Sequence, residues 1–157
     1  MENRKENKES ITIVWFDSDI HLYNHAENIN KRLRQINDYN LYYTGIDSCI
    51  NYIQSINKDK IFLITSSIGA SQSQILSQIN TLPQINSVFI FDFDKNQSNA
   101  FVVEHLKFIG LYTELDNLYS SIQEQIEFDD ELFQTFNFFD QYKYLTQDLS
   151  KQTFDLF

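Results

Sequence analysis

Five short apolar runs recur along the 157-residue chain, and this recurrence restricts the possible folds more than any other feature. Most of them are rich in β-branched or aromatic side chains, a composition typical of strands that are covered on both faces. The predicted strands span residues 11–16, 41–43, 60–65, 88–91 and 109–113.

Helical patterns separate these runs. In the first of them, Leu22, Ala26, Ile29, Leu33 and Ile36 step by four and three residues and form one apolar stripe. Pro83, the only proline, is placed to end the third helix. The predicted helices span residues 22–36, 46–56, 75–82, 101–106 and 115–126.

Strands that alternate with helices predict a parallel sheet with helices on both faces. Because crossover connections are right-handed, few strand orders are possible, and the order 2-1-3-4-5 is the simplest. The prediction is therefore a three-layer, doubly wound, five-stranded α/β fold of the flavodoxin-like kind. We expect the first, third and fourth strands to be central because they are the most uniformly apolar.

The chain divides into three predicted parts. Residues 1–10 are polar and of mixed charge, and we expect a disordered lead there. Residues 11–128 complete the α/β domain, and residues 129–157 form an acidic, aromatic tail or a linker to a missing domain. That tail either covers its own domain or docks another protein, and the two alternatives carry equal weight. Its apolar end, residues 154–157, leads us to expect a piece of a longer protein.

Composition excludes several function classes. The chain has 22 Asp and Glu against 12 Lys and Arg, which argues against nucleic acid or an anionic membrane as the partner. No apolar run reaches the roughly 20 residues of a membrane span. A single cysteine, Cys49, excludes a disulfide scaffold and favours a reducing, cytoplasmic location. Cys49 lies on an apolar stripe, so we expect a buried hydrophobic residue and not a nucleophile.

Ligands of this fold class bind at the carboxyl ends of the strands, where the strand order reverses. Asp17 and Asp19 follow the first predicted strand and Asp92 follows the fourth, so all three lie at these carboxyl ends. They form a candidate magnesium site because hard cations prefer carboxylate oxygens as ligands. Ser66, Ser67 and Thr113 form a candidate small-ligand site in hydroxyl-rich segments, the serines preceding a helix N-terminus. The alternative for both sets is helix capping and solvated loop ends.

The same positions carry a resemblance to the response-regulator receiver domain. In that family an acidic pair after strand 1 binds magnesium, an Asp ending strand 3 accepts a phosphoryl group, and a hydroxyl and a Lys end strands 4 and 5. This chain keeps acidic residues after its first strand and departs at the other three positions, which hold Thr65-Ser66-Ser67, Asp92 and Thr113-Glu114. A hydroxyl cannot form the acyl phosphate, and Glu114 adds negative charge where a phosphate needs a cation.

These departures lead us to expect a pseudo-receiver with no enzyme activity and no resident cofactor. Residues 11–17, 61–69 and 87–92 also resemble the N-terminal receiver-like modules of some invertebrate multidomain proteins, which precede tetratricopeptide repeats or mono-ADP-ribosyltransferase domains. That resemblance implies an accessory, regulatory domain whose partner is a protein or a C-terminal domain of the same chain. The alternatives are a magnesium-dependent phosphoryl-accepting switch that uses Asp17, Asp19 and Ser66, or a small-ligand-binding flavodoxin-like domain.

Overall fold

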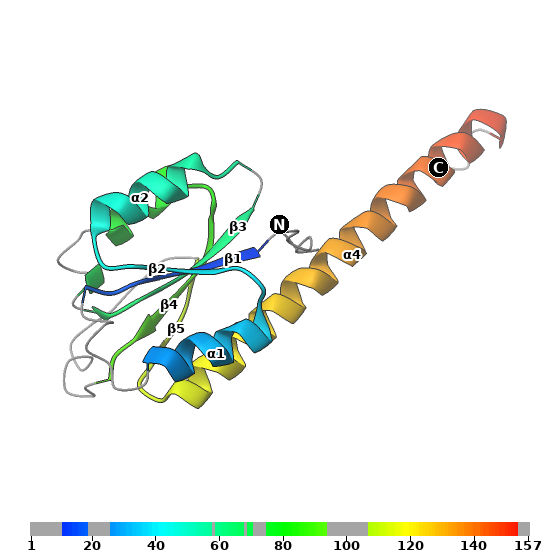
Figure 1. The fold of residues 1–157 in the computed structure, drawn as a ribbon. Coiled ribbons are helices and arrows are strands. Elements are labelled where there is room, and N and C mark those ends of the chain that lie inside the picture. Colours follow the sequence, from blue (N-terminus) through cyan, green and yellow to red (C-terminus); the bar gives the residue numbers. More distant parts are fainter. Residues whose placement is uncertain are drawn as a thin grey trace, which may run out of the picture. The chain divides into compact units, whose positions relative to one another are not determined.

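A computed structural model describes residues 11–18, 26–57, 59–67, 69–70, 75–93 and 107–153 (Figure 1). Its helices are α1 (Ala26–Ile36), α2 (Ile46–Ser55), the 3-10 helix η2 (Ile75–Thr81) and α4 (Leu115–Thr153). Its strands are β1 (Ile11–Phe16), β2 (Asn40–Tyr43), β3 (Lys60–Thr65), β4 (Ile85–Phe91) and β5 (Phe108–Tyr112). All strand pairs are parallel, and the order is β2-β1-β3-β4-β5. The predicted flavodoxin-like α/β fold is confirmed.

The burial of the strands follows their apolar content. Every residue of β1 is buried, as are all but one residue of β3 and of β4, whereas all residues of β2 and β5 are only partly buried. The central strands are therefore those whose sequences are continuously apolar, because helices cover both of their faces.

Side chains alternate between the two faces of the sheet. Val14 and Phe16 belong to a buried cluster that also contains Cys49 and Ile53 of α2. Trp15 lies on the opposite face, where its ring meets the edge of the Phe91 ring at a centroid distance of 6.0 Å. Each large side chain buried in this way contributes about 1.5–3 kcal/mol to folding.

Helix α1 and the beginning of α4 cover the face opposite α2 (Figure 1). Ile29 and Leu33 of α1 are fully buried, and Leu118 and Tyr119 of α4 are buried as well. The guanidinium carbon of Arg32 lies 5.3 Å from the centre of the Tyr119 ring, a cation–π contact between the two helices. The sheet is thus sandwiched between two helical layers, as the sequence predicts.

Several elements differ from their predicted form. The segment predicted as a helix over residues 75–82 is a 3-10 helix that ends at Thr81. Strand β4 starts at Ile85, before the predicted residue 88, because Ile85 pairs with Ile61 of β3. The polar Ser87 is buried within the strand, and its hydroxyl donates to Asn86 Oδ1. The predicted lead over residues 1–10 and the predicted helix over residues 101–106 lie outside the described residues.

Helix α4 runs far beyond its predicted end at residue 126, through Thr153. The chain divides into two compact units, Met1–Ser121 and Ile122–Phe157, so that α4 contributes to both. The predicted domain boundary between residues 128 and 129 falls inside this helix. In the part of the chain that the structure describes, none of the helices has an apolar stretch long enough for a membrane span.

Candidate functional site

The carboxyl ends of β1, β3 and β4 meet at one edge of the sheet, which we call the carboxyl edge. Phe16 pairs with Thr65, and Thr65 pairs with Ile90, so the residues that follow these strands leave the sheet together. The amide of Asp17 donates to the Tyr43 carbonyl at 3.0 Å, and that of Asp92 donates to the Tyr112 carbonyl at 2.9 Å. Asp17 and Asp92 are buried at this edge, with 4% and 2% of their surface exposed.

The Asp92 carboxylate links the end of β4 to the loop after β3. Its Oδ1 atom accepts a 2.9 Å hydrogen bond from the backbone N–H of Ser67. Its Oδ2 atom and the hydroxyl of Ser67 are buried, and neither has a hydrogen-bond partner among the described residues. The Oδ1 atom of Asp92 therefore has a structural role, whereas its Oδ2 atom is a buried hydrogen-bond acceptor with no donor among the described residues.

Ser66 acts as a helix cap. Its Oγ atom accepts the N–H of Gly69 at 2.8 Å, and its carbonyl accepts the N–H of Ala70 at 2.8 Å, the pattern of an N-cap residue. Gly69 is needed for this close approach, because a Cβ atom there would lie 2.9 Å from Ser66 Oγ. The capping alternative for this loop is therefore the one that the structure supports.

The predicted magnesium site is only partly described. Asp17 and Asp92 do lie at the same edge, whereas Asp19 lies outside the described residues, as does Asp94. The described residues contain no group of three or more His, Cys, Asp or Glu side chains suited to hold a metal ion. Mg²⁺ usually keeps several waters and binds through one or two carboxylates, a number that Asp17 and Asp92 supply. The magnesium site stays a prediction.

The predicted small-ligand residues follow β3 and β5, and the small-ligand site stays a prediction. Ser66 is used as a cap and Ser67 is buried, while Thr113 is partly buried after β5. Among the residues described at the carboxyl edge, none is Lys or Arg, and Glu114 is exposed there. A phosphate would meet carboxylates at this place, which is electrostatically unfavourable.

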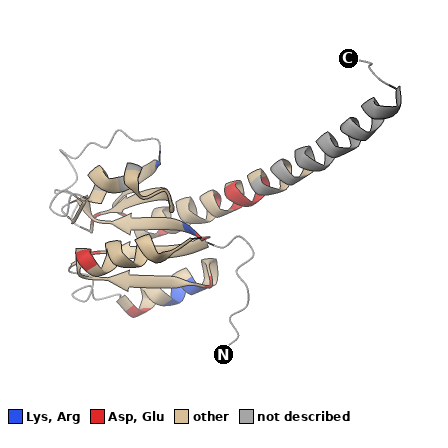
Figure 2. Ribbon diagram, turned by 90° about the horizontal axis from the view of Figure 1, so that it is seen from above, with Lys and Arg blue, Asp and Glu red and all other residues tan. Residues whose placement is uncertain are grey.

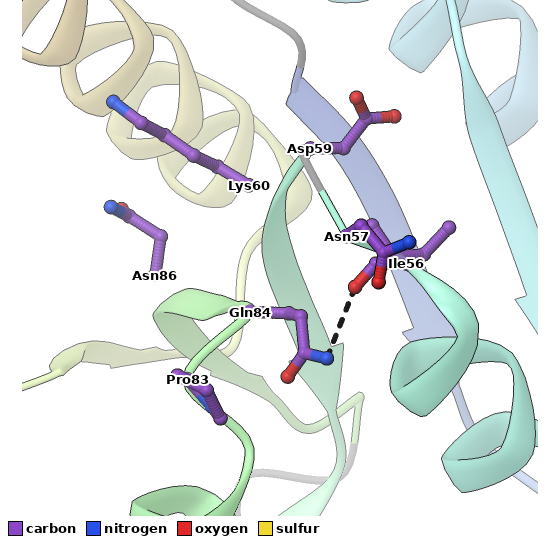
Figure 3. A pocket seen from close by; sticks show the side chains of 7 residues that line it. All are labelled: Ile56, Asn57, Asp59, Lys60, Pro83, Gln84 and Asn86. Carbon is purple, nitrogen blue, oxygen red and sulfur yellow. Dashed lines mark hydrogen bonds between the residues drawn. The ribbon is translucent and has the colours of Figure 1, made fainter.

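A hollow of about 400 Å³ lies at the edge of the sheet opposite the carboxyl edge, near the amino ends of β3 and β4 (Figure 3). The sequence reasoning did not find it, because its residues share no motif. The Gln84 amide nitrogen donates to the Ile56 carbonyl at 3.0 Å, and Asp59 Oδ2 accepts from the Thr12 hydroxyl at 3.2 Å. The lining residues are Ile56, Asn57, Asp59, Lys60, Pro83, Gln84 and Asn86.

The polar groups of this hollow do not converge on one point. Figure 3 shows the side chains of Asp59 and Lys60 directed away from one another. The Gln84 Oε1 atom has no partner among the described residues, but it is buried and therefore out of reach of a ligand in this conformation. The hollow offers no arrangement for general acid–base or nucleophilic chemistry, which needs groups within hydrogen-bond reach of one another.

Cys49 is the only thiol, and it is fully buried. Burial raises the pKa of its thiol to about 12. The thiolate, which is the nucleophilic form, is therefore scarce at neutral pH. The expectation that Cys49 is a buried hydrophobic residue is confirmed.

Helix α4 carries large apolar side chains that are exposed to solvent. Phe128, Leu132 and Phe138 have 56%, 54% and 64% of their surface exposed, and we call these three residues the exposed stripe. The aromatic content of residues 129–157 pointed to Phe138 but missed Phe128 and Leu132, which precede or interrupt the aromatic series. Helical spacing relates the first two, because Leu132 follows Phe128 by four residues and such positions share one face of a helix.

No protein-family model, curated protein or solved structure matches this chain.

Proposed function

We propose that this chain is a receiver-like domain that performs no catalysis and acts as a protein-interaction or regulatory module. The parallel sheet with the order β2-β1-β3-β4-β5 supplies the framework. The proposal is that the domain has lost phosphoryl transfer and has kept binding. A cytoplasmic location, expected for a chain with a single cysteine, belongs to the same proposal.

The observation that carries the proposal is the use of the loop after β3 to hold the fold together. In a phosphoryl-accepting receiver this loop would begin with a reactive carboxylate. Here Ser66 caps a turn of helix and the amide of Ser67 holds Asp92. The Ser66 hydroxyl is engaged as a cap, the Ser67 hydroxyl is buried, and a hydroxyl of either residue forms no acyl phosphate.

The exposed stripe supports the binding half of the proposal. Large apolar side chains that cluster on a surface mark interaction sites more often than scattered ones do. Phe128, Leu132 and Phe138 gather on one helix within eleven residues of sequence. Aromatic side chains are also the residues that dominate interface energies.

The phosphoryl half of the proposal is tested by intact-mass spectrometry. The chain is incubated with Mg²⁺ and a small acyl-phosphate donor, beside a receiver domain that retains its acceptor Asp as the positive control. We expect no mass gain in this chain and a gain of one phosphoryl group in the control. A gain in this chain that disappears in Ser66→Ala or Asp17→Asn would overturn the proposal.

A further inference from the structure

The three residues of the exposed stripe lie within an arc of about 120° on α4, since each residue of an α-helix turns by about 100°. Phe128, Leu132 and Phe138 present their rings and methyl groups over nearly three turns. The three apolar side chains stand at positions i, i+4 and i+10, and the polar Glu131 and Thr135 fall within the same arc. A stripe of this width can receive the apolar face of one amphipathic helix, with polar contacts between the anchors.

A carboxylate shares a hollow with one of the exposed rings. Glu131, Gln134, Thr135 and Phe138 line a shallow hollow of about 440 Å³ on α4. Glu131 is itself exposed. A carboxylate next to an aromatic ring suits a Lys or Arg side chain, because the aliphatic stem packs on the ring and the charged head pairs with the carboxylate.

The segment around the stripe is strongly acidic. Between Phe108 and Tyr142 the chain contains eight Asp and Glu and no Lys, Arg or His. Figure 2 shows acidic segments and no basic one on the coloured part of α4, and the first Lys of this helix in the sequence is Lys143. A partner with the opposite charge would be steered to this surface and held in register along it.

We propose that the exposed stripe docks a basic amphipathic helix of another protein, an inference that rests on the binding role proposed above. The apolar face of the partner would cover Phe128, Leu132 and Phe138, and its Lys or Arg side chains would meet Glu127 and Glu131. A second copy of this chain packed in parallel fits the surface poorly, because it sets Glu127 and Glu131 beside the same residues of the other copy. An antiparallel copy is tested by the sedimentation experiment below.

The test uses the full chain and a designed, fluorescently labelled peptide with Leu at helical a and d positions and Lys elsewhere. Binding is followed by fluorescence anisotropy. Two further peptides serve as comparisons: a scrambled sequence of the same composition, and an amphipathic peptide in which Glu replaces Lys. We expect saturable binding of the basic amphipathic peptide at least about tenfold tighter than that of either comparison.

Variants of the chain locate the binding surface. Replacing Phe128, Leu132 and Phe138 together by Gln, which keeps helix propensity, should weaken binding by about tenfold or more. The matched control is Phe93→Gln, because Phe93 is another exposed phenylalanine, 41% exposed, after β4. It should leave binding unchanged, and circular dichroism should show equal helix content in all variants.

Charge variants test the second part of the inference. Glu127→Gln with Glu131→Gln should weaken binding several-fold and reduce its dependence on salt. The control is Asp38→Asn with Asp47→Asn, which removes the same charge from two exposed positions elsewhere. That control should retain most of the affinity.

Three results would overturn the inference. Equal binding of the scrambled peptide would leave only non-specific charge attraction, and equal binding of the acidic peptide would remove the role of charge. A dimer in sedimentation analysis that the triple Gln variant abolishes would assign the stripe to a second copy. The proposed function is tested separately, by the mass gain of one phosphoryl group described above. If the basic peptide does not bind and no mass gain is seen, the basic helix is refuted as the partner and the proposed function is not.

Discussion

The hydrogen bond from the backbone N–H of Ser67 to Asp92 Oδ1 allows the structural role of this carboxylate to be tested by a substitution. In Asp92→Ala the backbone N–H of Ser67, which now donates to Oδ1 at 2.9 Å in a buried position, loses its acceptor. A buried donor left without a partner costs about 1–3 kcal/mol of stability. Asp92→Ala should therefore lower the free energy of unfolding by that amount.

Asp92→Asn is the matched comparison. Its amide oxygen can still accept the N–H of Ser67, and it removes a buried charge whose second oxygen has no hydrogen-bond partner among the described residues. We expect its free energy of unfolding to lie within about 1 kcal/mol of that of the unchanged chain. If Asp92 were instead kept for its charge, as in a metal site, the two substitutions would have similar effects in the presence of Mg²⁺.

Urea unfolding monitored by the fluorescence of Trp15 measures both values. Trp15 is the only tryptophan, is 1% exposed, and contacts Phe91, the residue before Asp92. With a slope of about 1–3 kcal/mol/M, the Asp92→Ala midpoint should fall by roughly 1 M. An unchanged midpoint for Asp92→Ala, or an equal loss for Asp92→Asn, would refute the structural role given to this carboxylate.

Three further predictions concern single residues. Gly69→Ala should destabilise the fold by about 1–3 kcal/mol in urea unfolding, because the new Cβ would lie 2.9 Å from Ser66 Oγ, and adding Ser66→Ala should recover part of the loss. Asn37→Ala should cost about 1–3 kcal/mol, because the Asn37 amide donates to the buried Ile11 carbonyl at 3.0 Å; a neutral effect would contradict this. Burial raises the pKa of Cys49 from 9.0 to about 12, so the stability contributed by its neutral thiol is complete below pH 9 and is lost as the pH rises toward 12. The folded chain should therefore resist thiol reagents at pH 8, and the free energy of unfolding of Cys49→Ala should fall less above pH 9 than that of the unchanged chain.

The central strands were predictable because their continuous apolar sequences fit only one environment, the interior of a sheet covered on both faces. Strands β1 and β3 have the predicted limits, since a continuous apolar run has no place outside a sheet covered on both faces. Strand β4 was predicted too short, because Ser87 interrupts its apolar run while remaining buried through a local hydrogen bond. Such local polar satisfaction is not visible in hydrophobic periodicity.

The length of α4 was missed although the sequence holds a signal for it. No Gly or Pro follows Gly110, so neither of the two helix-breaking residue types interrupts α4 between Leu115 and Thr153. The cluster of acidic and aromatic residues after Phe128 suggested a change of structure, yet these residue types are compatible with a helix that is solvated on one side.

The position of the candidate site was predictable, and its role as a metal or ligand site stays a prediction. The strand order placed Asp17, Ser66 and Asp92 at one edge, and all three are found there. Whether a Ser is a cap or a ligand-binding group depends on which N–H lies near its hydroxyl. The 2.8 Å contact from Gly69 to Ser66 supplies that information, and periodicity cannot.

Amide chemical shifts of the ¹⁵N-labelled chain test the central claim most directly, because one spectrum reports on the carboxyl edge and on α4 together. We predict that the basic amphipathic peptide shifts the amides of residues 124–138 and leaves those of Asp17, Ser67 and Asp92 in place. Mg²⁺ with an acyl-phosphate donor should shift neither set. Large shifts at Asp17, Ser67 and Asp92 on adding Mg²⁺ and the donor, with none on α4 from the peptide, would contradict the account.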